Sequence, residues 1–251
     1  MGFLDFLFDK EKSAERTLQK LEKKLTNMYV QAPERQYAVQ ELRELGHSEA
    51  VWVLLQRYNE NNPNTTVDIE EKELVFSTLV GMSRDADADV VGQIKRYVTE
   101  KEVKINWPMK ALHAILPEDK YVEFIVETLQ SCDTIFQRTT EKKQELMLRA
   151  MDVSSPELAR ELGRFLSDTD ETIRFLAFDA ALAQGHGEEI SEAFWTQLLV
   201  EDSSRITQKV MPELTTYQDL VVPDELKEDV EAFLPQGLGI HKEGYIYRRR
   251  R

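Results

Sequence analysis

The sequence predicts an all-α fold, an α-solenoid of about six helix pairs followed by a short C-terminal β-hairpin. Apolar residues recur three and four positions apart along most of the chain, which is the spacing of amphipathic helices. Glycine, serine and proline fall mainly between these periodic segments and divide them into pairs. One core position then recurs in six pairs at intervals of 31 to 38 residues, which indicates a repeat.

The charge balance of the 251-residue chain limits what it binds. Hydrophobic residues make up 41% and charged residues 31%, which suits a continuous core under a charged surface. The formal net charge is −14, and because the last four residues are all arginine, the remainder carries −18. Such a surface repels phosphate backbones, so we expect no nucleic-acid partner.

The single cysteine and the lack of a recognisable secretory signal favour the cytoplasm. Cys132 alone forms no internal disulfide and no cysteine-based zinc site. We find neither a secretory signal nor an apolar run near the roughly 20 residues of a membrane span. These features predict an acidic cytoplasmic protein.

Residues 1–12 are expected to cap the first repeat. Their apolar face is formed by Phe3, Leu4, Phe6, Leu7 and Phe8. The alternative is an anchor that inserts residues 3–8 into a membrane or a partner groove. Membrane anchors of this kind usually carry lysine or arginine on the polar face, whereas this one carries aspartates, so membrane contact is disfavoured.

Residues 33–58 hold the clearest helix pair. Leu42 and Leu45 lie on one face of the first helix, Gly46 and His47 break it, and Ser48 is placed to cap the second helix. The second helix carries an apolar stripe of Val51, Leu54, Leu55 and Tyr58. Residues 59–68 are polar and contain a proline, and we expect them to form the most mobile loop, either as a solvated insertion or as a partner-gripping loop.

The six pairs of residues 13–234 share one register. The core positions are Leu42, Leu79, Leu112, Ala150, Ala181 and Leu214. Four residues earlier stand Ala38, Val75, Pro108, Leu146, Ala177 and Val210, and three residues later stand Leu45, Met82, Ile115, Val153, Gln184 and Tyr217. Seven residues before the core position stand Arg35, Lys72, Ile105, Lys143, Arg174 and Thr207, four of which are basic. Pro108 and Gln184 depart from the apolar pattern, although Pro108 suits the first turn of a helix.

A second amphipathic helix follows each break. The expected buried stripes are Val90, Ile94 and Val98; Val122, Ile125 and Leu129; Leu158, Leu162 and Phe165; and Phe194 and Leu198. Ser155 before Pro156 is a good helix start, because serine caps and proline suits the first turn. Neither helix of a pair buries its stripe alone, so the pairs need like neighbours.

Residues 168–182 resemble a HEAT repeat of the bacterial, PBS-lyase type. That pattern has an aspartate six residues before an arginine, then small or apolar residues, and Asp168, Arg174, Ala177 and Ala181 meet it. Arg35, Ala38 and Leu42 form a second match, with Tyr29 at the aspartate position, and the other pairs are degenerate. The resemblance covers roughly residues 13–234 and implies an armadillo-like solenoid. It also implies that the aspartate and arginine pair between successive repeats and that the arginine-bearing helix lines the concave side.

Residues 235–251 form a separate tail. Pro235 ends the last helix, and residues 238–247 alternate around a turn in which Gly244 is expected to take the left-handed conformation. Four arginines at residues 248–251 follow. We expect them to be solvated, and the alternative is contact with the protein's own acidic surface or with an anionic partner.

We find no motif that indicates catalysis. The sequence has no glycine-rich phosphate loop, no HExxH and no GxSxG, and its four histidines are spread over separate repeats. We therefore expect no enzyme, no cofactor and no metal site. Two enzyme classes with HEAT-type folds, the bilin lyases and the DNA-base glycosylases, are disfavoured alternatives. The first lacks a supporting cysteine or histidine arrangement, and the second needs a basic groove.

The candidate partner-binding residues follow from helical geometry. If the core position faces inward, residues six before, two before and one after it lie on the opposite face. The residues selected on this face are Arg43, Lys110, His113, Gln144, Leu148, Met151, Phe175, Asp179 and Leu182. The four apolar ones form a strip of the kind that marks interfaces, unless the superhelix or the hairpin hides it. The sequence thus predicts a right-handed solenoid of HEAT-like pairs, a scaffold that binds a protein or peptide on its concave face.

Overall fold

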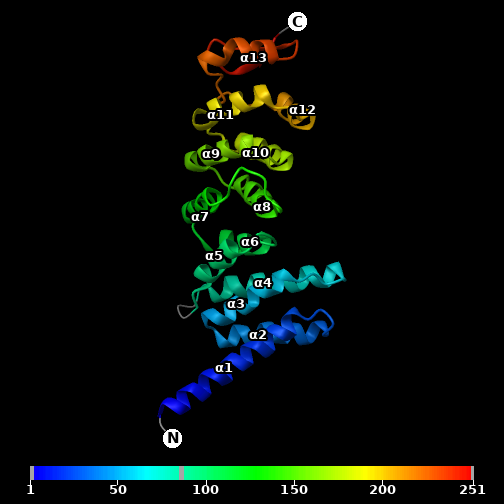
Figure 1. The fold of residues 1–251 in the computed structure, drawn as a ribbon, viewed down its shortest axis with the longest axis vertical. Helices are drawn as coiled ribbons and strands as arrows, with labels where there is room; N and C mark the ends of the chain where they lie inside the picture. Colours follow the sequence, from blue (N-terminus) through cyan, green and yellow to red (C-terminus); the bar gives the residue numbers. More distant parts are fainter. Residues whose placement is uncertain (1–2, 85–87, 250–251) are drawn as a thin grey trace. The chain divides into compact units, whose positions relative to one another are not determined.

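The computed structural model describes residues 3–84 and 88–249, with side chains from residue 12 onward. Within these residues the chain forms thirteen α-helices and one two-stranded antiparallel sheet (Figure 1). It divides into two compact units, Met1–Pro117 and Glu118–Arg251. No described helix is both long enough and apolar enough to cross a membrane.

Unit 1 (Met1–Pro117) consists of two rows of helices. Its elements are α1 (Phe3–Thr26), α2 (Ala32–Leu45), α3 (Ser48–Gln56), the 3₁₀ turn η1 (Arg57–Asn59), α4 (Thr65–Met82), α5 (Val90–Glu100) and α6 (Asn106–Ile115). Helices α2, α4 and α6 contact one another in turn, and α1, α3 and α5 do the same beside them (Figure 1). The first row therefore holds the first helix of each predicted pair in this unit, and α3 and α5 of the second row are partner helices, whereas α1 precedes the first pair.

Unit 2 (Glu118–Arg251) has the same two-row arrangement. Its elements are α7 (Glu118–Gln130), α8 (Glu141–Ala150), α9 (Pro156–Gly163), η2 (Arg164–Ser167), α10 (Glu171–Gln184), α11 (Gly187–Val200), α12 (Ser204–Glu213), η3 (Asp224–Leu226), α13 (Lys227–Phe233), β1 (Leu238–Ile240) and β2 (Ile246–Arg248). Helices α8, α10 and α12 contact one another in turn, and α7, α9, α11 and α13 form the other row.

The predicted core positions are confirmed by burial. All six core positions are buried, and so are all six residues that stand four positions earlier. The predicted stripes of the second helices are buried as well. Each row thus turns its apolar face toward the other, because neither face is stable in water.

Two details of the first pair differ from the prediction. Leu45 is exposed rather than inward, because α2 ends there and Gly46 turns the chain back in the left-handed conformation (φ 67°). The cap of α3 is His47, whose Nδ1 accepts the backbone N–H of Ala50 at 3.4 Å, rather than Ser48. The Ser48 hydroxyl instead accepts the backbone N–H of Asp89, which ties the first two pairs together.

Gln184, which departed from the apolar pattern, is buried and satisfied in unit 2. Its amide nitrogen donates to the carbonyl oxygens of Ala150 (2.7 Å) and Val153 (3.1 Å), and its amide oxygen accepts the N–H of Ser155 (3.1 Å). These are the groups that a helix end and a helix start leave unpaired. One side chain therefore joins α10 to the turn between α8 and α9.

The hairpin forms as predicted. Strands β1 and β2 pair with Ile240 opposite Ile246, and Gly244 takes a positive φ of 95° in the turn. The carbonyl oxygen of Gly244 accepts the N–H of Val222 at 2.9 Å, which fastens the turn to the segment before α13.

Helix α1 continues through the predicted N-terminal segment. Its backbone is helical from Phe3 to Thr26, and Leu21 and Leu25 on its C-terminal half are buried. The expected cap or anchor depends on side chains of residues 3–8, which lie outside the described ones.

Candidate partner-binding surface

In unit 1, the predicted partner-binding residues lie on the outer face of the α2, α4 and α6 row. Arg43 on α2 and Lys110 on α6 are exposed, and His113 on α6 is half-buried. Gln36, Glu73 and Ser77, which occupy equivalent positions, are exposed too. The geometrical rule therefore selects a solvent-facing surface in this unit.

In unit 2, the rule holds for α8 and fails near the end of α10. Leu148 is 40% exposed, and Gln144, Met151, Phe175 and Asp179 are half-buried. Leu182 is only 5% exposed. The reason is that the chain after α12 covers this end of α10, where Leu182, Tyr217 and Leu220 line one small space. Leu182 does not belong to an exposed strip.

Side chains of α12 also cover the middle of α10. The guanidinium of Arg205 lies 4.1 Å from the ring centroid of Phe175, and Lys209 forms an ion pair with Asp179 at 3.1 Å. The predicted apolar strip is thus reduced to Leu148, Met151 and the uncovered part of Phe175.

Unit 1 contains a groove of about 730 Å³ between α4 and α6. The lining residues are Glu70, Glu73, Leu74, Phe76, Ser77, Trp107 and Lys110. Three of these, Glu73, Ser77 and Lys110, stand at positions that the helical rule assigns to the outer face. The groove therefore opens on the predicted partner-binding surface.

Aromatic side chains form the floor of this groove. The rings of Phe76 and Trp107 meet edge to face at 6.4 Å, and Tyr58 lies parallel to Trp107 at 6.2 Å. Tyr58 is buried in unit 1, whereas Trp107 and Phe76 keep part of their surface exposed. A buried ring thus supports a half-buried one, which fixes the position of the Trp107 face that borders the groove.

The rim of the groove is charged. Glu70 and Glu73 are exposed and stand one helical turn apart on α4. From α6, Lys110 places its Nζ atom 4.8 Å from the Trp107 ring centroid, a cation–π contact. The lining residues thus carry two carboxylates and one ammonium group.

A buried ion cluster orients α4 from its other side. Both carboxylate oxygens of Glu71 accept from Arg35 on α2 (2.6 to 3.1 Å), and Oε2 also accepts twice from Arg57 in η1 (2.9 and 3.1 Å). Asp68 accepts from Arg57 at 2.8 Å and from Lys72 at 2.7 Å. Burial raises the pKa of Asp68, but the hydrogen bonds from Lys72, the backbone of Asn62 and Arg57 outweigh it and hold that pKa below its ordinary value. With Asp68 and Glu71 facing inward, Glu70 and Glu73 face the groove.

The segment expected to be a mobile loop belongs to this cluster. Lys72 donates to the side chain of Asn61 at 2.9 Å, and the N–H of Asn62 donates to Asp68 at 2.8 Å. The Tyr97 hydroxyl donates to the side chain of Asn59 at 2.8 Å. Because its polar residues bind buried charges, the segment is held at several points rather than free in solvent.

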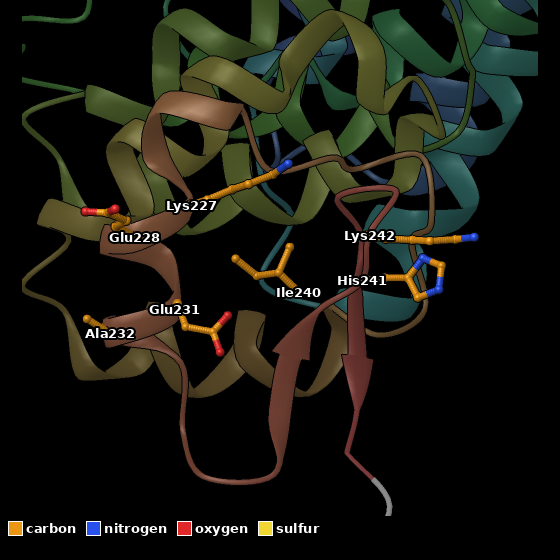
Figure 2. Close-up of a pocket in the computed structure, with 7 residues that line it drawn as sticks. All are labelled: Lys227, Glu228, Glu231, Ala232, Ile240, His241 and Lys242. Carbon is orange, nitrogen blue, oxygen red and sulfur yellow. The ribbon is translucent and has the colours of Figure 1, made fainter.

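A second cavity, of about 630 Å³, lies in unit 2 between α13 and the hairpin. Figure 2 shows Glu231 of α13 and Ile240 of β1 extending toward each other across this space, whereas Lys242 extends away from α13. Glu231 is already paired with Arg249, which follows β2. The arginine run was expected either to be solvated or to contact an acidic surface. Arg249 contacts the protein's own acidic surface, through Glu231.

Unit 2 contains one serine–histidine contact. Ser154 Oγ lies 3.1 Å from His186 Nε2 and donates its proton to the carbonyl oxygen of Gln184 at 2.7 Å. Within the described residues, no three histidine, cysteine, aspartate or glutamate side chains converge as metal ligands would.

The helical rule missed the three apolar residues that line the groove, Leu74, Phe76 and Trp107, although Leu74 and Trp107 share one register position. Both stand five residues before the core position, and Tyr37 occupies the same position in the first pair. Three large apolar residues at a position next to the polar face were a usable signal. Scans against protein-family models, curated proteins and solved structures found no match to this chain.

Proposed function

We propose that this protein is a non-catalytic scaffold in the cytoplasm that binds a protein or peptide partner. In this proposal the helix pairs of residues 13–234 continue as a right-handed, HEAT-like solenoid, and the α2, α4 and α6 row contributes to its concave face. The two rows of helices within each unit support it. So does the placement of basic residues at one register position, four of which are held in ion pairs.

The groove between α4 and α6 is the observation that carries this proposal. It combines an apolar floor of Trp107 and Phe76 with a charged rim, which is the usual composition of a site that orients a bound segment. Partly exposed aromatic side chains of this kind supply much of the binding energy at interfaces. Lys110 is the predicted partner-binding residue that lines the groove.

The remaining predicted residues form weaker candidates in the proposal. Leu148 and Met151 contribute a small apolar surface in unit 2. Phe175 and Asp179 take part only if Arg205 and Lys209 move away from them, because those side chains now occupy the same surface. The scaffold is therefore expected to bind chiefly through unit 1.

The test is capture of partners from native lysate by the immobilised full chain, with identification by mass spectrometry. Ser77→Arg fills the groove from an exposed position and is expected to abolish capture of the specific partner without lowering the melting temperature. Ser13→Arg adds the same side chain to an exposed site on α1 and serves as the matched control. Equal capture by the wild type and Ser77→Arg would show that the groove is not the binding site.

A further inference from the structure

We infer that the segment held in the α4–α6 groove is cationic, a peptide whose arginine or lysine side chain lies on Trp107 between Glu70 and Glu73. This inference rests on the proposed function and names the chemistry of its partner. It starts from the two carboxylates. Neither Glu70 nor Glu73 has an ion-pair partner within the described residues, although both line the groove.

Trp107 supplies the second element of the site. A cation already lies over this ring, since Lys110 Nζ is 4.8 Å from the ring centroid. The ring of Tyr58, which is buried, lies parallel to that of Trp107 at 6.2 Å. The ring is thus fixed in a position where its electron-rich face attracts a positive charge.

In this inference Lys110 occupies the position over the Trp107 ring that the cationic side chain of the partner takes, and it does not itself bind the partner. It is exposed, its described contact is the Trp107 ring, and its charge opposes that of the incoming side chain. A guanidinium group competes well for the position, because it stacks on aromatic rings and binds carboxylates with two parallel hydrogen bonds. Glu70 and Glu73 stand on the facing helix to accept those bonds.

The field of the whole chain acts in the same direction. The chain carries a net charge of −14, which raises the local concentration of a basic partner and its rate of association. The groove is also lined by the apolar residues Leu74 and Phe76, against which an apolar residue next to the cationic one in the peptide can pack. A segment that alternates arginine with leucine therefore matches the groove in both respects.

The experiment measures binding of a short fluorescein-labelled peptide of alternating arginine and leucine by fluorescence anisotropy. The probe for comparison is the same peptide with citrulline, an uncharged analogue, in place of arginine. The double variant Glu70→Gln/Glu73→Gln is expected to weaken arginine-peptide binding roughly three- to tenfold, because it removes two exposed ion pairs. The variant Lys110→Ala is expected to strengthen binding about two- to fivefold, because it removes a competing cation.

A charge-matched control separates the groove from the general field. Glu34→Gln/Glu44→Gln removes the same charge from exposed positions on α2 and is expected to leave affinity unchanged. An equal loss in this control would overturn the inference, because it would assign binding to net charge alone. All three variants replace exposed side chains, so their melting temperatures are expected to stay within about 2 °C of the wild type.

Other outcomes distinguish this inference from the proposed function. If the citrulline peptide binds as tightly as the arginine peptide and Ser77→Arg blocks both, the groove binds peptides and the cationic inference fails. If Ser77→Arg changes neither peptide binding nor capture from lysate, the proposed function fails. The chain also carries a cationic segment of its own, the C-terminal arginine run. If the protein self-associates and Glu70→Gln/Glu73→Gln abolishes this self-association, the groove binds a second copy of this chain, and the inference of a different partner is overturned.

Discussion

The carboxylate of Asp168 pairs with Lys143, twenty-five residues before it, whereas Arg174, six residues after it, donates from its guanidinium to the backbone carbonyl oxygen of Asp168 at 3.1 Å. The Lys143 Nζ atom lies 2.6 Å from Asp168 Oδ2, and the two side chains are 1% and 0% exposed. Lys143 also donates to the carbonyl oxygen of Asp133 at 3.1 Å. A charge pair this deep keeps its hydrogen bonds because an unpaired buried charge is far more costly.

The same contact occurs again one helix pair later. Arg174 stands at the register position of Lys143, seven residues before the core position, and Glu201 stands at that of Asp168, thirteen residues before it. Arg174 donates to both carboxylate oxygens of Glu201, at 2.8 and 2.9 Å. Each of these two cations therefore binds the carboxylate that opens the next helix pair.

Replacing Arg174 tests this contact. The Glu201 side chain is 0% exposed, so Arg174→Met leaves a buried carboxylate without its main partner. The expected loss in the free energy of unfolding is about 3 kcal/mol, the lower end for a broken buried pair, because Arg174 itself keeps some exposure. Urea denaturation measures the change.

The double variant Arg174→Met/Glu201→Met provides the control. It removes both charges and is expected to recover much of the lost stability, as buried pairs replaced by apolar residues often do. If the double variant loses the sum of the two single losses, Arg174 and Glu201 are not energetically coupled.

Acid is expected to destabilise both units. Burial raises the pKa of Glu201, but the hydrogen bonds from Arg174 and the Ser203 backbone outweigh it and lower that pKa, as the bonds to Asp68 do in unit 1. The unfolded chain, with pKa values near the ordinary 4.5 and 3.8, then binds more protons in acid. The stabilisation is therefore full above these values and is lost as the pH falls below them.

Melting temperature against pH checks this expectation. Glu201→Gln should be less stable than the wild type near neutral pH and should lose less on acidification, because one depressed carboxyl is gone. Glu188→Gln makes the same substitution at an exposed position on α11 and serves as the charge-matched control. A Glu201→Gln curve parallel to that of the wild type would contradict the assignment.

The core register predicts which leucines matter. Leu42 and Leu112 are both 0% exposed, so Leu42→Ala and Leu112→Ala should each cost about 2–5 kcal/mol. Leu45, three residues beyond Leu42 on the same helix, is 41% exposed. Leu45→Ala should stay within about 0.5 kcal/mol of the wild type. Comparable losses at Leu42 and Leu45, measured by thermal unfolding, would show that α2 is rotated.

Gln184 is expected to contribute more stability than a leucine in its place. Gln184→Leu leaves the carbonyl oxygens of Ala150 and Val153 without this partner, at about 1–3 kcal/mol for each buried group left unpaired. Gln208→Leu on the exposed side of α12 is the matched control and should be nearly neutral. A stabilising Gln184→Leu variant would mean that apolar packing suffices at this turn.

The sequence predicts much of this fold because helical periodicity is a local property. The positions of Leu79 and Ala181 in the core follow from spacing alone, and so does the first-turn placement of Pro108. Leu45 and Ser48 were misplaced because the end of α2 and the cap of α3 depend on backbone conformation at Gly46 and His47. Such local choices are weakly encoded in residue type.

The site was harder to predict because it depends on long-range pairing. Glu71 had a usable signal, since it stands four residues before buried Val75, but its partners Arg35 and Arg57 are 36 and 14 residues away. Periodicity does not say which cation meets which carboxylate. In the same way, nothing in the sequence of α10 indicates that Arg205 of another helix covers Phe175.

The repeated cation-to-carboxylate contact has a consequence for how such a chain grows. A tandem duplication of residues 168–200, inserted after Val200, would present a new Asp168 to the original Arg174 and a new Arg174 to Glu201. No buried charge would lose its partner at either junction. A duplication that contains only one of Asp168 and Arg174 would leave a buried charge unmatched, so natural length variants of this architecture should differ by whole helix pairs.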